Sequence, residues 1–309
     1  MTRRRHRPDP FRYFREDLDR IIDRRTNSAT DKLFSALLDD ITVAAEAAGS
    51  ATAAVIYVER AIRYALARGQ GKLVAALTQD IRRIAEEAAM EGARRTAHAF
   101  EQLDGSVPPV LTNEVMLQNK ARMRASVDAE ALSTNFAPVL LAALVVAVDQ
   151  AMRPKPQVDQ AAVTRAEQVQ AAVSAIKSQR YIAERAAVWH ATHAFNATQG
   201  DIFEEVWPHV PDLMKRWTEK VSDSTGLPLD NRVAVDSRVM HGQVAFPTGV
   251  FVMPPDPRVP KSLQGKQWSH PPNRPHDRAV LTPWRPSWGI PGWIWRNGQK
   301  LAMKRSLSP

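Results

Sequence analysis

Lys215-Arg216-Trp217 is the first of four short motifs spaced through the last third of this 309-residue chain. The other three are Val239-Met240-His241-Gly242-Gln243-Val244, Pro271-Pro272-Asn273 and Asp277-Arg278. Short apolar segments separated by Pro, Gly and Asp residues are typical of small domains with brief strands and tight turns. The motifs therefore predict a small α+β domain over residues 207–282, with short strands at 216–218, 239–246 and 279–281.

The chain changes character near Trp207-Pro208. Seven of its 22 prolines precede this point and fifteen follow from Pro208 onward. The preceding part is rich in Ala, and its apolar residues recur at three- and four-residue steps, which is typical of helices. The first such stripe consists of Phe11, Phe14, Leu18, Ile21 and Ile22.

Several long helices are expected after this first stripe. They are predicted at about 28–47, 51–68, 72–103, 112–152 and 159–206, with breaks at 104–109 and 153–156, a bend or interruption at Pro138 and a join near Gly200. Long Ala-rich helices separated by short Pro-containing breaks favour antiparallel packing. We therefore expect a mainly α protein, with an N-terminal antiparallel helical bundle over residues 28–206.

Positive charge is concentrated at the two ends of the chain, although the net charge is only +9. Residues 1–25 hold nine Arg and five acidic residues, and residues 253–309 hold ten basic and two acidic residues. We predict a basic amphipathic N-terminal arm over 1–27 and an extended tail rich in Trp, Pro and basic residues over 283–309. Such asymmetry indicates contact with a polyanion, either nucleic acid or an acidic protein surface.

The candidate contact residues are the cations and Trp side chains of these two ends. They are Arg3, Arg4, Arg5, Arg7, Lys261, Lys266, Arg274, Arg285, Trp288, Trp293 and Trp295. The N-terminal Arg run can neutralise phosphates, and a solvated terminal arm is the alternative. Arg and Trp together suit base stacking on single-stranded nucleic acid and also the anchor positions of protein interfaces. For the C-terminal tail we favour the protein interface.

Composition excludes several classes of protein. The chain has no Cys, which rules out disulfides, thiolate metal sites and cysteine nucleophiles. Residues 1–25 lack the apolar core of a secretory signal, so we expect none there. The longest apolar run, residues 137–148, is shorter than the roughly 20 residues that a membrane span needs. We interpret this run as a buried helix and expect no membrane span.

Two sets of side chains are candidate metal ligands. His190 and His193 lie three residues apart on a predicted helix, with Glu184 or Asp201 as a further ligand. The second set is His241, His270, His276 and Asp277, whose nitrogen and oxygen atoms would suit zinc if two loops converged. Neither spacing is specific for a metal. We favour structural polar roles for both sets and expect no metal or other cofactor.

A hydrolase or transferase is a further alternative, with His241 acting beside Asp223 or Asp236. This function requires His241 within hydrogen-bond reach of one of those carboxylates. The chain contains no Gly-x-Ser-x-Gly, Walker or His-Glu-x-x-His motif, and Asp and Ser are ordinary turn formers. We therefore expect that the protein is not an enzyme.

The motifs resemble the small C-terminal domain of the phage Mu protein F head-morphogenesis family over residues 187–282. The matching segments are the helix that ends Ala194-Phe195-Asn196, the Lys215-Arg216-Trp217 strand, Asp223 in the following loop, His241-Gly242-Gln243-Val244, Phe251 and the Pro271-Pro272-Asn273 turn. The Asn-Cys-Arg-Cys strand of the family is represented by His276-Asp277-Arg278-Ala279, which retains only the Arg. Any cysteine-dependent feature of the family is therefore absent from this chain.

The resemblance implies a minor capsid protein of a tailed phage. Such a protein associates with the portal inside the head during assembly, and its partners include the portal, the scaffold or major capsid protein, and packaged double-stranded DNA. It is located in the virion, and in the host cytoplasm during assembly. The alternative from charge alone is a nucleic-acid-binding protein outside any virion, which uses both basic arms.

Structural roles are expected for the motif residues, which are Trp217, His241, Gly242, Pro272, Asn273 and Arg278. Trp217 should anchor the core of the small domain, because a large ring in a short strand is stabilised by burial. Gly242 should permit a turn or a close approach of the backbone. Pro271-Pro272-Asn273 should form a rigid loop, with His241 hydrogen-bonded to it.

Overall fold

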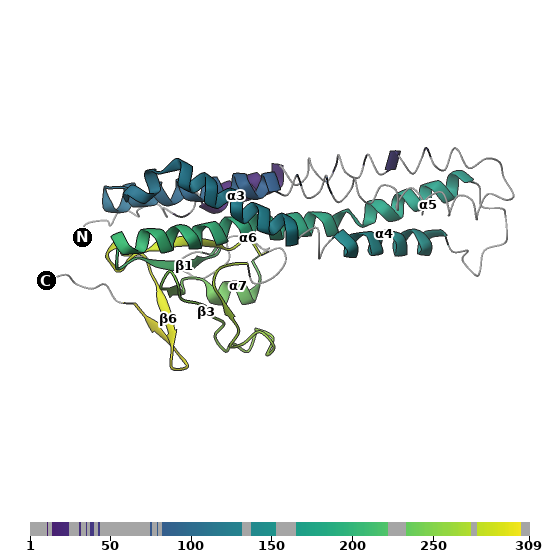
Figure 1. Cartoon of the computed structure of the whole chain (residues 1–309). Helices are drawn as coiled ribbons and strands as arrows, with labels where there is room; N and C mark the ends of the chain where they lie inside the picture. Colours follow the sequence, from purple (N-terminus) through teal and green to yellow (C-terminus); the bar gives the residue numbers. More distant parts are fainter. Residues whose placement is uncertain are drawn as a thin grey trace, which may run out of the picture. The chain divides into compact units, whose positions relative to one another are not determined.

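The computed structural model describes residues 11, 14–24, 82–131, 137–152, 165–221, 233–272 and 277–303, and seven single residues between 31 and 79. The fold is mainly α, with a small α+β part in the C-terminal third, as the sequence predicts (Figure 1).

The chain forms two compact units, each assembled from separate stretches of sequence. One comprises residues 1–22, 84–126 and 188–309, and the other comprises residues 23–83 and 127–187. This division differs from the four consecutive segments expected from the sequence. The reason is that apolar residues near the N-terminus and from the helix over 82–104 share one hydrophobic core with the small α+β part.

The second unit contains α4 (Ala137–Met152) and α5 (Arg165–Ser178), which pack against each other. α4 contains the apolar run that was expected to be a buried helix. Leu144 is fully buried there, but Val139 and Val146 are 58% and 52% exposed, so the described residues cover only part of α4. Within the described ranges, no helix combines the length and apolar content needed to cross a membrane.

The described helices outside α4 follow the predicted breaks with one exception. Residues 14–24 and 82–104 are helical, and the break at Gly105 leads into the 3-10 turn η1 (Pro109–Thr112) and α3 (Glu114–Ala131). The predicted helix over 159–206 is divided at Gln179 into α5 and α6 (Arg180–Val206), and not at Gly200. Gly200 lies within α6 near the side chain of Leu281. The 3-10 turn η3 (Trp207–His209) ends this helical part.

A three-stranded antiparallel sheet forms the centre of the small α+β part. Its strand order is β2 (Val244–Ala245), β1 (Met214–Thr218) and β5 (Val280–Trp284), with Arg216 paired to Val244 on one side and Thr282 on the other. The strand predicted over 239–246 is only partly correct. Residues 239–240 belong to α7 (Val235–Met240), which turns at His241-Gly242 into β2. A second, two-stranded sheet pairs β3 (Phe251–Val252) with β4 (Gln267–Trp268).

The expected extended tail is wrong for the described residues 283–303, which are folded. After β5, the chain forms a 3-10 turn η4 (Pro286–Trp288) and a hairpin of β6 (Trp293–Arg296) and β7 (Gln299–Ala302). The turn residues Asn297 and Gly298 have φ angles of 52° and 73°, the positive values that a two-residue hairpin turn requires. Asn-Gly is itself a strong hairpin signal, which the mixture of Trp, Pro and Gly residues obscures.

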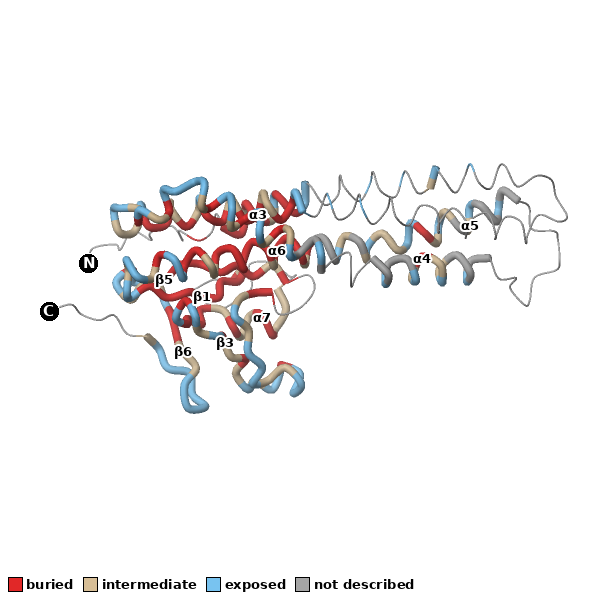
Figure 2. Tube along the Cα trace, viewed as in Figure 1, coloured by how far each residue is buried: buried red, intermediate tan, exposed pale blue. Residues whose placement is uncertain are grey.

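The N-terminal apolar stripe is confirmed, but the chain itself buries it. Phe11, Phe14, Leu18, Ile21 and Ile22 are all at most 6% exposed and lie in the main hydrophobic core. Much of α6 and β1 is likewise buried (Figure 2). Trp288 is part of this core, with ring centroids 6.4 Å from Phe11 and 5.4 Å from Phe100. The described part of the N-terminal segment is therefore a core helix and not a free arm.

Candidate functional site

Trp217 lies at the centre of the sequence motifs, in the middle strand of the sheet. It is fully buried and packs edge-to-face on Phe251, with ring centroids 5.4 Å apart. Its main chain joins the second motif directly: its N–H donates to the carbonyl of Gln243, and its carbonyl accepts the N–H of Gly242, each at 2.9 Å. The expected role of Trp217 as a core anchor is confirmed.

The His241-Gly242-Gln243 turn connects three strands. The carbonyls of His241 and Gly242 accept the indole and main-chain N–H groups of Trp293, at 2.8 and 3.0 Å, which attaches β6. The side-chain amide of Gln243 donates to the carbonyl of Val252 and accepts its N–H, at 3.0 and 2.8 Å, which attaches β3. Together with β1, these contacts form the motif hub, which we define as Trp217, His241, Gly242, Gln243 and Trp293.

Gly242 is required in the motif hub for two physical reasons. Its φ angle is 80°, a region that L side chains rarely adopt. A Cβ atom at this position would also lie 3.3 Å from the ring of Trp293. Both the turn and the close approach expected for Gly242 are therefore present.

His241 is held by groups from β1 and the residue that follows it. Its Nδ1 accepts the N–H of Glu219 at 3.0 Å, and its Nε2 lies 3.4 Å from the guanidinium of Arg216. Asn273, in the loop expected to bond His241, lies outside the described residues, whereas Pro271 and Pro272 are buried and joined by a cis peptide bond. The described partners orient the His241 ring within the sheet.

Arg216 is a buried cation that bonds to the interior of the domain. It is 1% exposed, and it donates to the hydroxyl of Thr218 at 3.0 Å and to the carbonyl of Pro291 at 3.1 Å. The Thr218 hydroxyl also shares a 2.7 Å hydrogen bond with that of Thr282 on β5. Arg216 therefore links the central sheet to the segment that precedes β6.

A pair of buried carboxyl groups lies beside the motif hub. Glu219 and Asp277 are 4% and 1% exposed and are hydrogen-bonded to each other. Burial, and then the charge of Asp277, raise the pKa of Glu219 well above its ordinary value. Two adjacent buried carboxylates repel when both are ionised, so the protonated form of Glu219 is favoured beside Asp277. Sequence reasoning identified Asp277 in a motif but missed Glu219, whose only signal is its position directly after β1.

The enzyme alternative requires a carboxylate beside the His241 ring. Two groups that contact the ring are the main-chain N–H of Glu219 and the guanidinium of Arg216. Asp236 is buried on α7, and Asp223 lies outside the described residues.

The structure brings together one His from each of the two predicted metal sets. The rings of His193 and His270 lie 4.8 Å apart, whereas the carboxylate of Asp201 binds Arg124 through two hydrogen bonds of 2.6 and 2.7 Å and that of Glu184 binds Arg180 at 2.7 Å. In the part of the chain that the structure describes, no three His, Asp or Glu side chains are grouped to hold a metal. His276 lies outside that part.

His270 is strongly perturbed by its surroundings. Burial, together with the nearby charges of His193, Lys215 and Arg124, lowers its pKa from 6.5 to about 4. The ring is therefore neutral at neutral pH. Its Nδ1 lies 2.6 Å from the carbonyl of Pro271, at the start of the Pro-Pro motif.

Three of the predicted partner contacts are engaged by other groups of the domain. Trp288 and Trp293 are 8% and 6% exposed, and Arg285 binds Asp104 and Asp212, at 2.6 and 2.8 Å. The Trp288 indole N–H also donates to Asp104, at 2.7 Å. The sequence suggests partner contacts for these three side chains because the acidic and aromatic residues that surround them in the fold include residues distant in sequence.

The remaining predicted contacts divide by their surroundings. Lys261 and Lys266 are exposed, and Trp295 is half-buried at the surface of the hairpin. The members of the set outside the described residues are Arg3, Arg4, Arg5, Arg7 and Arg274.

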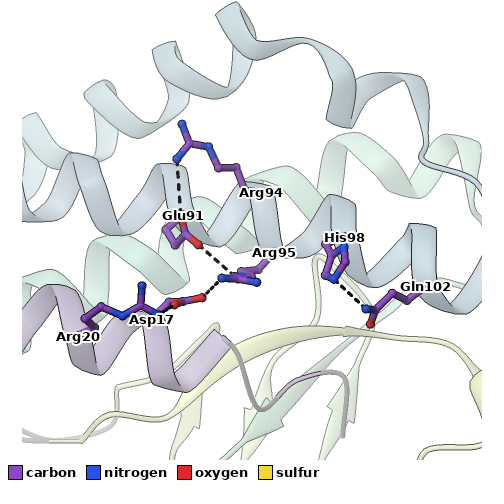
Figure 3. Close-up of polar contacts among 7 residues, drawn as sticks. All are labelled: Asp17, Arg20, Glu91, Arg94, Arg95, His98 and Gln102. Carbon is purple, nitrogen blue, oxygen red and sulfur yellow. Dashed lines mark hydrogen bonds and ion pairs between the residues drawn. The ribbon is translucent and has the colours of Figure 1, made fainter. Parts of the chain in front are cut away.

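Ion pairs fix the N-terminal helix (residues 14–24) to its neighbours. Asp19 binds Arg278 at 2.8 Å and Lys220 at 3.3 Å, so the retained Arg of the last motif has a structural role. On the neighbouring face, Asp17 pairs with Arg95, which also binds Glu91 at 3.0 Å (Figure 3). The guanidinium of Arg15 donates to the carbonyl of Glu219, next to the carboxyl pair.

The site as a whole is a packed polar core that positions strands, with the described exposed cations outside it. Searches of protein-family models, curated proteins and solved structures find no match to the chain.

Proposed function

We propose that this protein is a minor capsid protein of a tailed phage, of the head-morphogenesis type, that associates with the portal inside the head during assembly. The observation that carries the proposal is the motif hub. Two of the segments through which the sequence resembles that family, Lys215–Trp217 and His241–Val244, meet at one strand, β1, through the main-chain bonds of Trp217 with Gly242 and Gln243. This contact between separate motifs supports the proposal.

The helix of the resemblance is joined to the same site. Asn196 closes the matching segment of α6, and its side chain bonds the main chain of Ala279 and Leu281 at the start of β5. Arg278, the retained residue of the last motif, lies directly before this segment and binds Asp19. The parts of the resemblance therefore form one interior, which supports a structural module.

The distribution of charge supports two kinds of contact. The chain between its basic ends is slightly acidic, which suits packing on a protein scaffold, whereas the basic ends suit DNA or an acidic portal face. Lys261 and Lys266 are exposed, and within the described ranges they form no ion pair. These cations are available to a polyanionic partner.

The proposal predicts a portal protein encoded in the same genome, and co-purification of this chain with that protein is the test. The two proteins, co-expressed with a tag on the portal only, should elute as one complex at about 0.15 M salt, where long-range charge effects are screened. A Lys261→Glu, Lys266→Glu double variant measures the contribution of the exposed cations, and an Arg122→Glu variant on α3 is the control for a charge reversal at another part of the surface. Separate elution of the two unmodified proteins would contradict the proposal.

A DNA titration separates this function from that of a nucleic-acid-binding protein outside a virion. The latter should bind duplex DNA tightly, with an affinity that falls steeply between low and moderate salt because phosphate contacts release counterions. A portal-associated protein should instead bind its protein partner at moderate salt with only weak affinity for free duplex. Tight DNA binding without portal binding would favour the alternative.

A further inference from the structure

A groove of ≈ 180 Å³ lies between the edge of the central sheet and the β6–β7 hairpin. One wall comes from β2 and the loop after it, and the other comes from β6. The lining includes Val244, Ala245, Phe246, Val250, Ile294 and Trp295. Phe246 and Val250 are 56% and 44% exposed, so the groove is an apolar surface open to solvent.

The groove exists because two strands separate after a single pairing. A parallel bridge joins Gln243 to Trp293, and it is the last pairing between β2 and β6 in the described residues. Beyond it, β6 follows β7 and forms the hairpin, which projects away from the central sheet (Figure 1). A sheet that would otherwise continue from β5 through β1 and β2 to β6 is interrupted here.

Main-chain groups face this gap from both walls. The Gln243 carbonyl accepts the N–H of Trp217 on β1, so the carbonyl of the next residue, Val244, faces away from β1. In the hairpin, Arg296 and Gln299 flank the two-residue turn, so the N–H and carbonyl of Trp295 face away from β7. Strand edges of this kind are templates for an added strand.

The positive charge around the hairpin favours the binding of an acidic strand. Residues 278–309 contain six Lys and Arg residues and no Asp or Glu. On the hairpin, Arg296 and Lys300 are exposed, and neither forms an ion pair with a described residue. A second copy of the chain would bring like charges together at this edge, which disfavours self-association.

The aromatic side chains argue against nucleic acid as the occupant. Trp284 and Trp288 are buried, and the face of the Trp293 ring is covered by the Lys300 ammonium, 4.4 Å from its centroid. Only Trp295 of the four C-terminal Trp rings is more than 9% exposed. Single-stranded nucleic acid needs several free rings for successive bases, whereas an extended peptide needs apolar lining and strand edges.

We infer that this groove binds an extended acidic segment of a partner protein, which adds a strand beside Trp295 in the positive field of Arg296 and Lys300. Apolar side chains of the guest, at alternate positions, occupy the lining between Phe246 and Ile294. The inference does not depend on the identity of the partner as a portal protein.

The test uses the full chain and a short synthetic peptide that alternates Val with Glu. Binding is followed by NMR through the indole N–H signal of Trp295, with the buried Trp217 as an internal reference. We expect the Trp295 signal to shift with a dissociation constant of about 1 mM or tighter, whereas a peptide that alternates Val with Lys should leave it unchanged. Equal binding of the two peptides, or no shift with the acidic one, would overturn the inference.

Matched charge reversals locate the binding surface. Arg296→Glu should weaken binding of the acidic peptide by about tenfold, because like charges then face each other, while Lys261→Glu, which changes the net charge equally, should leave it within about twofold. Equal weakening by the two variants would show a diffuse charge effect and contradict the groove. A larger Trp295 shift with oligothymidine than with the acidic peptide would contradict the inference and indicate that the groove binds single-stranded nucleic acid.

Discussion

Asn196 on α6 bonds the main chain of Leu281 on β5 in the way that a neighbouring strand would. Its side-chain Oδ1 accepts the Leu281 N–H at 2.6 Å, and its Nδ2 donates to the carbonyl of Ala279 at 2.9 Å. Asn196 is fully buried, so water cannot replace these bonds. A single helical amide therefore satisfies part of the outer edge of the three-stranded sheet.

Removing this amide should destabilise the protein strongly. We expect Asn196→Ala to lower the free energy of unfolding by about 2–4 kcal/mol, because two buried main-chain groups lose their partners. Chemical denaturation measures the change. The control is Asn119→Ala at an exposed position of α3, which should change stability by less than about 0.5 kcal/mol. Similar losses in the two variants would contradict the role of Asn196.

Two glycines with nearly equal φ angles allow the cost of backbone strain to be measured separately from the cost of steric crowding. Gly242 and Gly265 have φ angles of 80° and 77°, but only at Gly242 would a Cβ approach a ring, that of Trp293. Gly265→Ala should cost about 1 kcal/mol from the backbone alone. Gly242→Ala should cost about 2–4 kcal/mol, since overpacking adds to the same strain. Thermal unfolding measures the stability of the two variants. Equal losses of stability would show that crowding against Trp293 does not contribute at Gly242.

The carboxyl pair predicts a loss of stability as pH rises. Because the pKa of Glu219 is raised in the folded chain, the folded state keeps a proton that the unfolded state releases above its ordinary pKa of 4.5. The free energy of unfolding should therefore fall as the pH increases from 4.5 toward the raised value. Glu219→Gln, which keeps a neutral group beside Asp277, should flatten this dependence in a denaturation series, whereas the exposed Glu101→Gln should not. An unchanged slope in Glu219→Gln would show that the pair does not share a proton.

The lowered pKa of His270 predicts the opposite effect, a loss of stability as the pH falls in the acid range. Its pKa falls from 6.5 to about 4 on folding, so between these values the unfolded chain binds a proton that the folded chain does not. Stability contributed by the neutral ring is complete above pH 6.5 and is lost as the pH falls toward 4. His270→Gln should remove on the order of 2 kcal/mol of this variation, while His98→Gln, on an exposed ring, should retain it. The measurement is the difference in unfolding free energy between pH 7 and pH 4.5 for each variant.

The sequence predicts the elements whose signals are local. The apolar stripe of Phe11 and Leu18, the break at Gly105 and the short strand around Trp217 all follow from side-chain period or turn chemistry, and all are present. The hairpin at Asn297-Gly298 was missed although its signal is equally local. The chain is divided at Gln179 and continues as a helix through Gly200, which lies near Leu281, a residue far away in sequence.

The site was harder to predict because its partners are distant in sequence. Glu219 and Asp277 lie on either side of the central motifs, and His193 meets His270 across 77 positions of the chain. Exposed and buried cations are also indistinguishable by residue type: Arg285 binds two acids, while Lys261 binds none among the described residues. Identity of side chains gives the chemistry available, but tertiary contacts decide which groups are left for a partner.

The pairing of Asp19 with Arg278 has a consequence for biosynthesis. The two residues are separated by 259 positions, and ribosomes add about 5–20 residues per second. The first helix therefore emerges roughly 13–50 s before its ion-pair partner at that rate, with its stripe of Phe, Leu and Ile exposed. During this interval the nascent chain needs a chaperone, or a transient substitute for its missing core, to escape aggregation.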